Sequence, residues 1–97
     1  MIQVRSIFQV KADKGPELVA LLKESAKQFP TQHHEAHILT NPNGPVFTIV
    51  TEAAFDSVEA WEQGFLQAVT KPEFGALLAR IIPLIHSGSR EFYTIEA

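Results

Sequence analysis

The sequence predicts an α+β domain in which four strands form one antiparallel sheet and two helices cover one of its faces. Two kinds of segment support this fold class. Alternating or β-branched segments are typical of strands, and between them lie two segments with apolar residues at spacings of three and four. The order is therefore strand-helix-strand-strand-helix-strand, in which short connections place both helices on one side of the sheet. The 97 residues are expected to form a single domain, residues 1–97.

The first strand is expected at residues 2–11, because apolar and polar residues alternate along it. One of its faces carries most of the apolar residues: Ile2, Val4, Phe8 and Val10. A break in the alternation follows, and Pro16 then suits the first position of a helix. Apolar residues at helical spacing continue to Phe29, and Pro30 ends the helix.

The next two strands are expected to form a hairpin. The second strand is predicted at residues 33–40 and the third at residues 46–51, which are rich in β-branched and aromatic residues. Residues 41–45 between them are mostly turn-forming, and Gly44 among them can adopt a positive φ angle.

The second helical region is expected to begin near Asp56, whose carboxylate would cap the first free amides. Four apolar residues line its inner face: Val58, Trp61, Phe65 and Val69. Pro72 either kinks one long helix or separates two shorter ones, with Thr70 as a second cap. Gly88 is expected to end this region, and residues 90–96 are predicted to form the last strand.

Composition and charge exclude several classes of protein. The formal net charge is −3, so the chain lacks the basic surface that nucleic acids require, and no nucleic-acid partner is expected. The absence of cysteine removes disulfides and cysteine-bound metals and fits a reducing compartment. No apolar segment approaches the about 20 residues of a membrane-spanning helix, and the N-terminal residues do not resemble a signal peptide. A cytoplasmic protein with no membrane partner is therefore expected.

The densest polar cluster lies at residues 33–37. On one strand, His33, Glu35 and His37 would share a face, and two histidines with a carboxylate form a known set of metal ligands. The alternative is a solvated strand edge or an interface, because the segment after Pro30 also fits a loop. We expect no bound metal and keep His37 as a candidate ligand-binding residue.

Two charged residues lie among apolar positions of the predicted strands. Arg5 is expected in the middle of the first strand, where a charge needs a partner or water. It could bind the carboxylate or phosphate of a ligand, or form an ion pair with Glu35, Glu52 or Glu91, within the chain or across a dimer. Glu52 is expected at the end of the third strand, where it could act as a general base in an apolar cleft or simply face water.

Three parts of the sequence carry a resemblance to known proteins: Val4-Arg5-Ser6; residues 52–61 (EAAFDSVEAW); and Pro72-Glu73-Phe74 with residues 83–85 and 87–91. Together they resemble the dimeric α/β-barrel superfamily, which includes the antibiotic-biosynthesis monooxygenases, and within it NIPSNAP-type domains most closely. The resemblance implies a ferredoxin-like βαββαβ fold and a ligand cleft between the sheet and the second helical region. Trp61 and Phe65 would then form an aromatic wall of that cleft.

The resemblance does not extend to cofactor binding. Haem-degrading members of the superfamily carry an Asn on the first strand and a His on a helix. Here the first strand has Gln3 and Gln9 instead, and the second helical region has no His before His86. No cofactor is therefore expected. The candidate ligand-binding residues are Arg5, His37, Glu52, Trp61 and Phe65.

Two functions remain open from the sequence. The chain could bind a small molecule in the helix-sheet cleft, with or without cofactor-free catalysis, or it could be a non-catalytic dimeric interaction or structural module. A cavity beneath Trp61 would favour the first function, and a solid core there would favour the second. Both functions include a homodimer, because the helices cover one face of the sheet whereas apolar residues occur on both.

Overall fold

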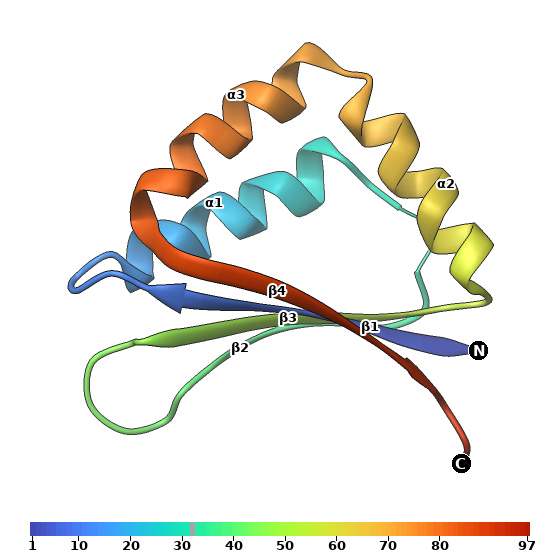
Figure 1. Ribbon diagram of the computed structural model, residues 1–97, viewed down its shortest axis with the longest axis horizontal. Coiled ribbons are helices and arrows are strands. Elements are labelled where there is room, and N and C mark those ends of the chain that lie inside the picture. Colours follow the sequence, from blue (N-terminus) through green and yellow to red (C-terminus); the bar gives the residue numbers. More distant parts are fainter. Residues whose placement is uncertain (32) are drawn as a thin grey trace.

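The structure, a computed structural model, describes residues 1–31 and 33–97. These residues form a four-stranded antiparallel sheet with every helix on one face (Figure 1). The elements are β1 (Ile2–Val10), α1 (Gly15–Gln28), β2 (Ala36–Thr40), β3 (Thr48–Phe55), α2 (Val58–Val69), α3 (Pro72–Ile81), the 3-10 helix η1 (Ile82–Leu84) and β4 (Ile85–Thr94). The strands lie side by side in the order β2-β3-β1-β4. The predicted fold class is confirmed, and the second helical region is divided into α2 and α3. Among the described residues, no helix is both long and apolar enough to cross a membrane.

Three strand boundaries differ from the predicted ones by three residues or more, whereas the end of β1, the start of β3 and the end of β4 differ by one or two residues. β2 begins at Ala36 rather than residue 33, β3 extends to Phe55 rather than residue 51, and β4 begins at Ile85 rather than residue 90. Gly88 consequently pairs with Phe8 inside the sheet and does not end a helix. The reason is that β3 and β4 both pair along nearly the whole length of β1. That pairing supplies hydrogen bonds to a polar segment whose own sequence does not predict a strand.

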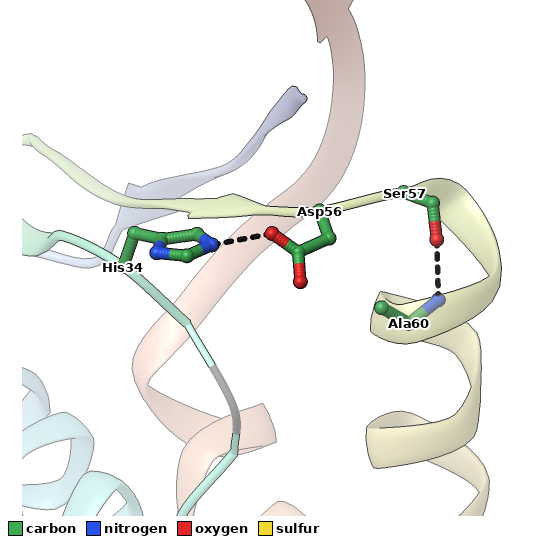
Figure 2. Close-up of polar contacts among 4 residues, drawn as sticks. All are labelled: His34, Asp56, Ser57 and Ala60. Carbon is green, nitrogen blue, oxygen red and sulfur yellow. Dashed lines mark hydrogen bonds and ion pairs between the residues drawn. The ribbon is translucent and has the colours of Figure 1, made fainter.

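The predicted caps of the second helical region are wrong (Figure 2). The cap of α2 is Ser57, whose Oγ accepts a hydrogen bond of 3.1 Å from the amide of Ala60. Asp56 instead accepts a hydrogen bond of 2.6 Å from Nε2 of His34. Thr70 follows α2 and donates its hydroxyl proton to a carbonyl of the last turn of that helix. Asp56 therefore ties the start of α2 to the segment that precedes β2.

The loop between β2 and β3 is held by the side chain of Asn41. Its amide nitrogen donates to two loop carbonyls, at 2.9 and 3.0 Å. Its oxygen accepts hydrogen bonds from the amides of Phe47 and Thr48. Gly44 adopts a φ of 71°, as the sequence predicted for this turn.

The buried core lies between the sheet, α1 and α3. Its members come from strands and helices alike: Val10, Leu18, Leu21, Phe29, Ile49, Leu77, Ile81 and Leu84. Leu18 and Ile49 are fully buried. By contrast, α2 contributes no buried residue, because it lies over the opposite end of the sheet from this core (Figure 1). The helix layer therefore buries its own residues at the end formed by α1 and α3, whereas the residues of α2 stay at least partly exposed.

Alternation along the strands gives the sheet two different faces. Val4, Val10 and Ile49 face the helices and are buried. The residues that alternate with this helix-facing set lie on the opposite face, which no helix of the described residues covers (Figure 1). We name this the open face; its central members are Gln3, Arg5, Ile7, Gln9, His37, Leu39, Val50, Glu52, Glu91 and Tyr93.

Candidate ligand-binding cleft

A cleft of about 640 Å³ lies between the sheet and the helices, beside the buried core. Its floor is the helix-facing side of the sheet, and its walls come from α1, α2 and α3. Aromatic side chains form much of its surface: Phe29, Phe55, Trp61, Phe65 and Phe74. Clefts of this size and apolar character are typical binding sites for small molecules.

The wall contributed by α2 is an aromatic cluster centred on Trp61. Trp61 and Phe65 are about one helical turn apart, so both point from the same side of α2. Their rings are stacked, with centroids 5.2 Å apart and an angle of 13° between the planes. Phe92 of β4 meets Trp61 edge-on at 4.9 Å, and Phe74 of α3 meets Phe65 edge-on at 6.0 Å. These contacts hold α2 over the cleft without burying any of its residues.

The cleft also contains hydroxyl and imidazole groups. Ser6 of β1 and Thr51 of β3 are paired in the sheet, and both line the floor. At another part of the lining, Oγ1 of Thr31 lies 3.1 Å from Nδ1 of His33. The His33 ring lies edge-on to Phe55, with 6.4 Å between the ring centroids. These groups can form hydrogen bonds with a ligand whose apolar surface rests against the aromatic walls.

Within the described part of the chain, Arg90 of β4 is the charged group that contacts Trp61 and Phe65. Its guanidinium carbon lies 5.1 Å from the ring centroids of both Trp61 and Phe65. Its Nε donates a long hydrogen bond of 3.4 Å to Oγ of Ser6. Burial lowers the pKa of Arg90, because the charged guanidinium loses part of its hydrating water. A cation on the rim of an apolar cleft can bind an anionic group of a ligand.

Arg90 was not among the residues predicted from the sequence, although one signal for it was present. Arg90 and Phe92 are two residues apart, so on any strand they share a face. With the strand predicted to begin at residue 90, however, Arg90 stood at a strand end where water could surround it. The observed β4 begins five residues earlier, so Arg90 lies within this edge strand and pairs with Ser6 at the middle of β1.

The structure separates the five predicted ligand-binding residues into two groups. Trp61 and Phe65 line the cleft together. Arg5, His37 and Glu52 direct their side chains to the open face, because they alternate with the cleft-facing residues of their strands. His37 and Glu52 border the cleft only as members of the strands that form its floor. The five residues therefore do not form one site.

Arg5 and Glu52 form an ion pair at the centre of the open face. They are direct neighbours across β1 and β3, and Nη2 of Arg5 lies 3.2 Å from Oε2 of Glu52. The guanidinium of Arg5 also lies over the ring of Tyr93, at 5.7 Å. Glu52 thus lies within β3 rather than at its end, and its side chain is only 16% exposed. Of the partners considered for Arg5, the structure selects Glu52.

The histidine-rich segment does not form the metal site considered from the sequence. β2 begins at Ala36, so His33 precedes the strand and contacts Thr31 in the cleft. Nε2 of His37 instead donates to Oε1 of Glu35 at 3.1 Å. Within residues 1–31 and 33–97, no three His, Asp or Glu side chains are grouped to hold a metal ion.

Comparison with known proteins gives a clear result at the level of the fold. No family model and no curated protein matches the sequence. Solved structures do match: a NIPSNAP domain protein from Burkholderia xenovorans has a TM-score of 0.82 at 19% identity, covering 100% of this chain and 96% of that chain. A NIPSNAP family protein from Agrobacterium tumefaciens has a TM-score of 0.77 at 15% identity, covering 98% and 86% of the two chains.

A third similar structure is that of an enzyme. It is a mutant of a cofactor-independent oxygenase from Streptomyces nogalater, with a TM-score of 0.75 at 14% identity, covering 99% of this chain and 93% of that chain. At such identities the likeness establishes the fold alone. The resemblance inferred from the sequence is confirmed to that extent: the chain has the ferredoxin-like α/β fold of NIPSNAP-domain proteins and of the antibiotic-biosynthesis monooxygenases.

Proposed function

We propose that the protein binds a planar, mostly apolar small molecule in the cleft beneath Trp61. The stacked pair of Trp61 and Phe65 carries this proposal. The pair lines a cleft of about 640 Å³, yet α2 contributes no buried residue to the core. Aromatic rings that are not needed for a core and that face a cleft are well suited to stack against a flat ligand.

A purely structural role would require a solid core beneath Trp61. The core instead lies under α1 and α3, at the other end of the helix layer. The space beneath α2 also contains the hydroxyl groups of Ser6 and Thr51, which a packed core would not need. These observations favour ligand binding over a non-catalytic interaction module.

We propose further that any reaction in this cleft would need no bound cofactor. One protein of similar fold is a cofactor-independent oxygenase. The sequence supports the same proposal, because it has no cysteine to bind a metal or cluster and lacks the strand Asn and helix His of haem-degrading relatives.

The proposal is testable because Trp61 is the only tryptophan in the chain. A panel of planar aromatic compounds, both neutral and charged, would be titrated into the protein while the single indole N–H resonance is followed by NMR. At least one compound should shift that resonance in a saturable way. Phe65→Ala should weaken this binding, whereas Leu66→Ala, at the next and exposed position, should not.

Two results would contradict ligand binding in this cleft. A folded protein whose indole resonance responds to none of the compounds would rule out an aromatic ligand in this cleft. Equal binding by wild type and Phe65→Ala would place the ligand elsewhere. Native mass spectrometry of freshly purified protein provides an independent check, since a retained ligand would add a discrete mass.

We propose that the protein works as a homodimer joined through the open face. That face carries a group of apolar side chains, among which Leu39 is 44% and Tyr93 48% exposed. Its central charges, Arg5 and Glu52, neutralise each other, so they do not oppose contact between two copies. A two-fold contact between open faces would bury these apolar groups, and a stable interface of this kind covers about 1,200–2,000 Å².

We also propose that residues 1–97 act as one domain in the cytoplasm. The first and last strands, β1 and β4, are neighbours in the sheet, which favours a single folding unit. The absence of cysteine is compatible with a reducing compartment. Fractionation of cells that express the tagged protein would test the location, and recovery outside the cytosolic fraction would contradict it.

A further inference from the structure

We infer that the ligand of this cleft is a planar aromatic carboxylate, whose carboxylate group is bound by the guanidinium of Arg90. The inference rests on the proposed function and adds the chemical class of the ligand. It rests on Arg90, the one arginine that forms no ion pair with a carboxylate among the described residues.

The three arginines of the chain differ in their partners. Arg5 pairs with Glu52 at 3.2 Å, and Arg80 pairs with Glu24 at 3.3 Å. Arg90 has no carboxylate within ion-pair distance among residues 1–31 and 33–97, and its hydrogen bond to Ser6 involves only Nε. A guanidinium has five N–H donors, so the four on its terminal nitrogens remain available.

The aromatic rings do not compete for these donors. Arg90 lies against the stacked pair of Trp61 and Phe65, with its guanidinium carbon 5.1 Å from each ring centroid. Ring faces attract the positive charge but accept no strong hydrogen bond. Arg90 is exposed as a whole, but part of its guanidinium is shielded from water, which makes an anion a more favourable partner than it would be in bulk water. Arg90 is thereby pre-positioned to form a bidentate pair at the edge of the cleft.

The lining favours one negative charge on an otherwise apolar ligand. The only other cationic residue that lines the cleft, within the described part of the chain, is Lys23 on α1, which is exposed to water. The carboxylate of Glu52 is engaged by Arg5 on the open face and does not compete for Arg90. A carboxylate matches the fork of one guanidinium, whereas a phosphate dianion would keep an uncompensated charge against aromatic walls.

The test measures how tightly two probes of the same shape, 2-naphthoate and 2-naphthamide, bind to the intact chain. The indole resonance of Trp61 reports the binding of both. We expect 2-naphthoate to bind at least about tenfold more tightly than 2-naphthamide, which corresponds to ~1.4 kcal/mol. Arg90→Gln should abolish this preference and leave the affinity for 2-naphthamide within about twofold of wild type. Arg90→Lys, which keeps the charge, should retain part of the preference.

Arg80→Gln is the matched control, because Arg80 lies on α3 outside this cleft and should leave both affinities unchanged. Equal affinities of the two probes in wild type, or a preference that survives in Arg90→Gln, would overturn the carboxylate inference and leave the proposed cleft in place. Binding of neither probe to the folded protein would overturn the inference, and the proposed function would fall with it if every compound of the planar panel also left the indole resonance unchanged.

Discussion

Trp61 is partly buried at the side of a cleft, and this determines how much its removal should destabilise the protein. Trp61→Ala is expected to lower the free energy of unfolding by about 1–3 kcal/mol, because it deletes contacts with Phe65 and Phe92 but leaves no enclosed cavity. Leu18→Ala, at a fully buried position, should lower it by about 3–5 kcal/mol. Denaturant titration followed by circular dichroism would measure both losses. A larger loss for Trp61→Ala would mean that Trp61 belongs to the core.

Tyr93 reports on the open face, because it is the only tyrosine of the chain. The carboxylate of Glu91, two residues away on the same face, raises the pKa of Tyr93 above its ordinary value of about 10, because it can accept a hydrogen bond from the neutral phenol and because its charge opposes ionisation. The folded state therefore holds the phenol proton more tightly than the unfolded chain does. The resulting stability is present below pH of about 10 and is lost as the pH rises through the raised pKa.

Titration of phenolate absorbance in the folded protein should consequently give a midpoint above that of a free tyrosine. Glu91→Gln should lower the midpoint, because it removes the negative charge that opposes ionisation. A midpoint that does not respond to Glu91→Gln would exclude this carboxylate as the cause.

At the scale of the element, the start of α2 depends on Ser57 rather than Asp56 (Figure 2). Ser57→Ala is expected to lower the free energy of unfolding by about 1 kcal/mol through loss of the cap. Asp56→Ala should cost less, about 0–1 kcal/mol, because its bond to His34 is between two exposed side chains. Both values come from denaturant titration at neutral pH. The reverse order of the two losses would identify Asp56 as the cap after all.

At the scale of the whole molecule, the open face should determine the assembly. Light scattering after size exclusion is expected to give about twice the 10.8 kDa mass of the chain. Leu39→Asp on the open face should shift the protein toward the monomer, because it introduces a charge into the proposed interface. Leu66→Asp, at a similarly exposed position on α2, should leave the mass unchanged. A folded wild-type monomer at low micromolar concentration would contradict the dimer.

The whole protein is also expected to bind neither haem nor zinc with useful affinity. The haem-binding pattern of related folds is absent from the sequence, and His33 is separated from His37 by the start of β2. A haem titration should therefore produce no Soret band, and elemental analysis should find no stoichiometric zinc. Stoichiometric zinc that is lost in the His33→Ala, His37→Ala double variant would contradict this prediction.

Local patterns in the sequence were sufficient for the order of the elements. The first strand, the first helix and the break at Pro72 follow from periodicity and from proline, and the structure confirms them. The turn at Gly44 and the aromatic side of α2 also follow from spacing within a few residues. These features depend on neighbours in the chain, so a single sequence contains the information that specifies them.

The sequence by itself therefore determined the fold class, the two types of sheet face and the aromatic wall of Trp61 and Phe65. Only the tertiary structure decided that Arg90 joins this wall while Arg5 and Glu52 lie on the opposite face. Arg90 reaches Ser6 across 84 positions of the chain, through the pairing of β4 with β1. No local pattern predicts that register, because the polar start of β4 becomes a strand only through hydrogen bonds supplied by a distant partner.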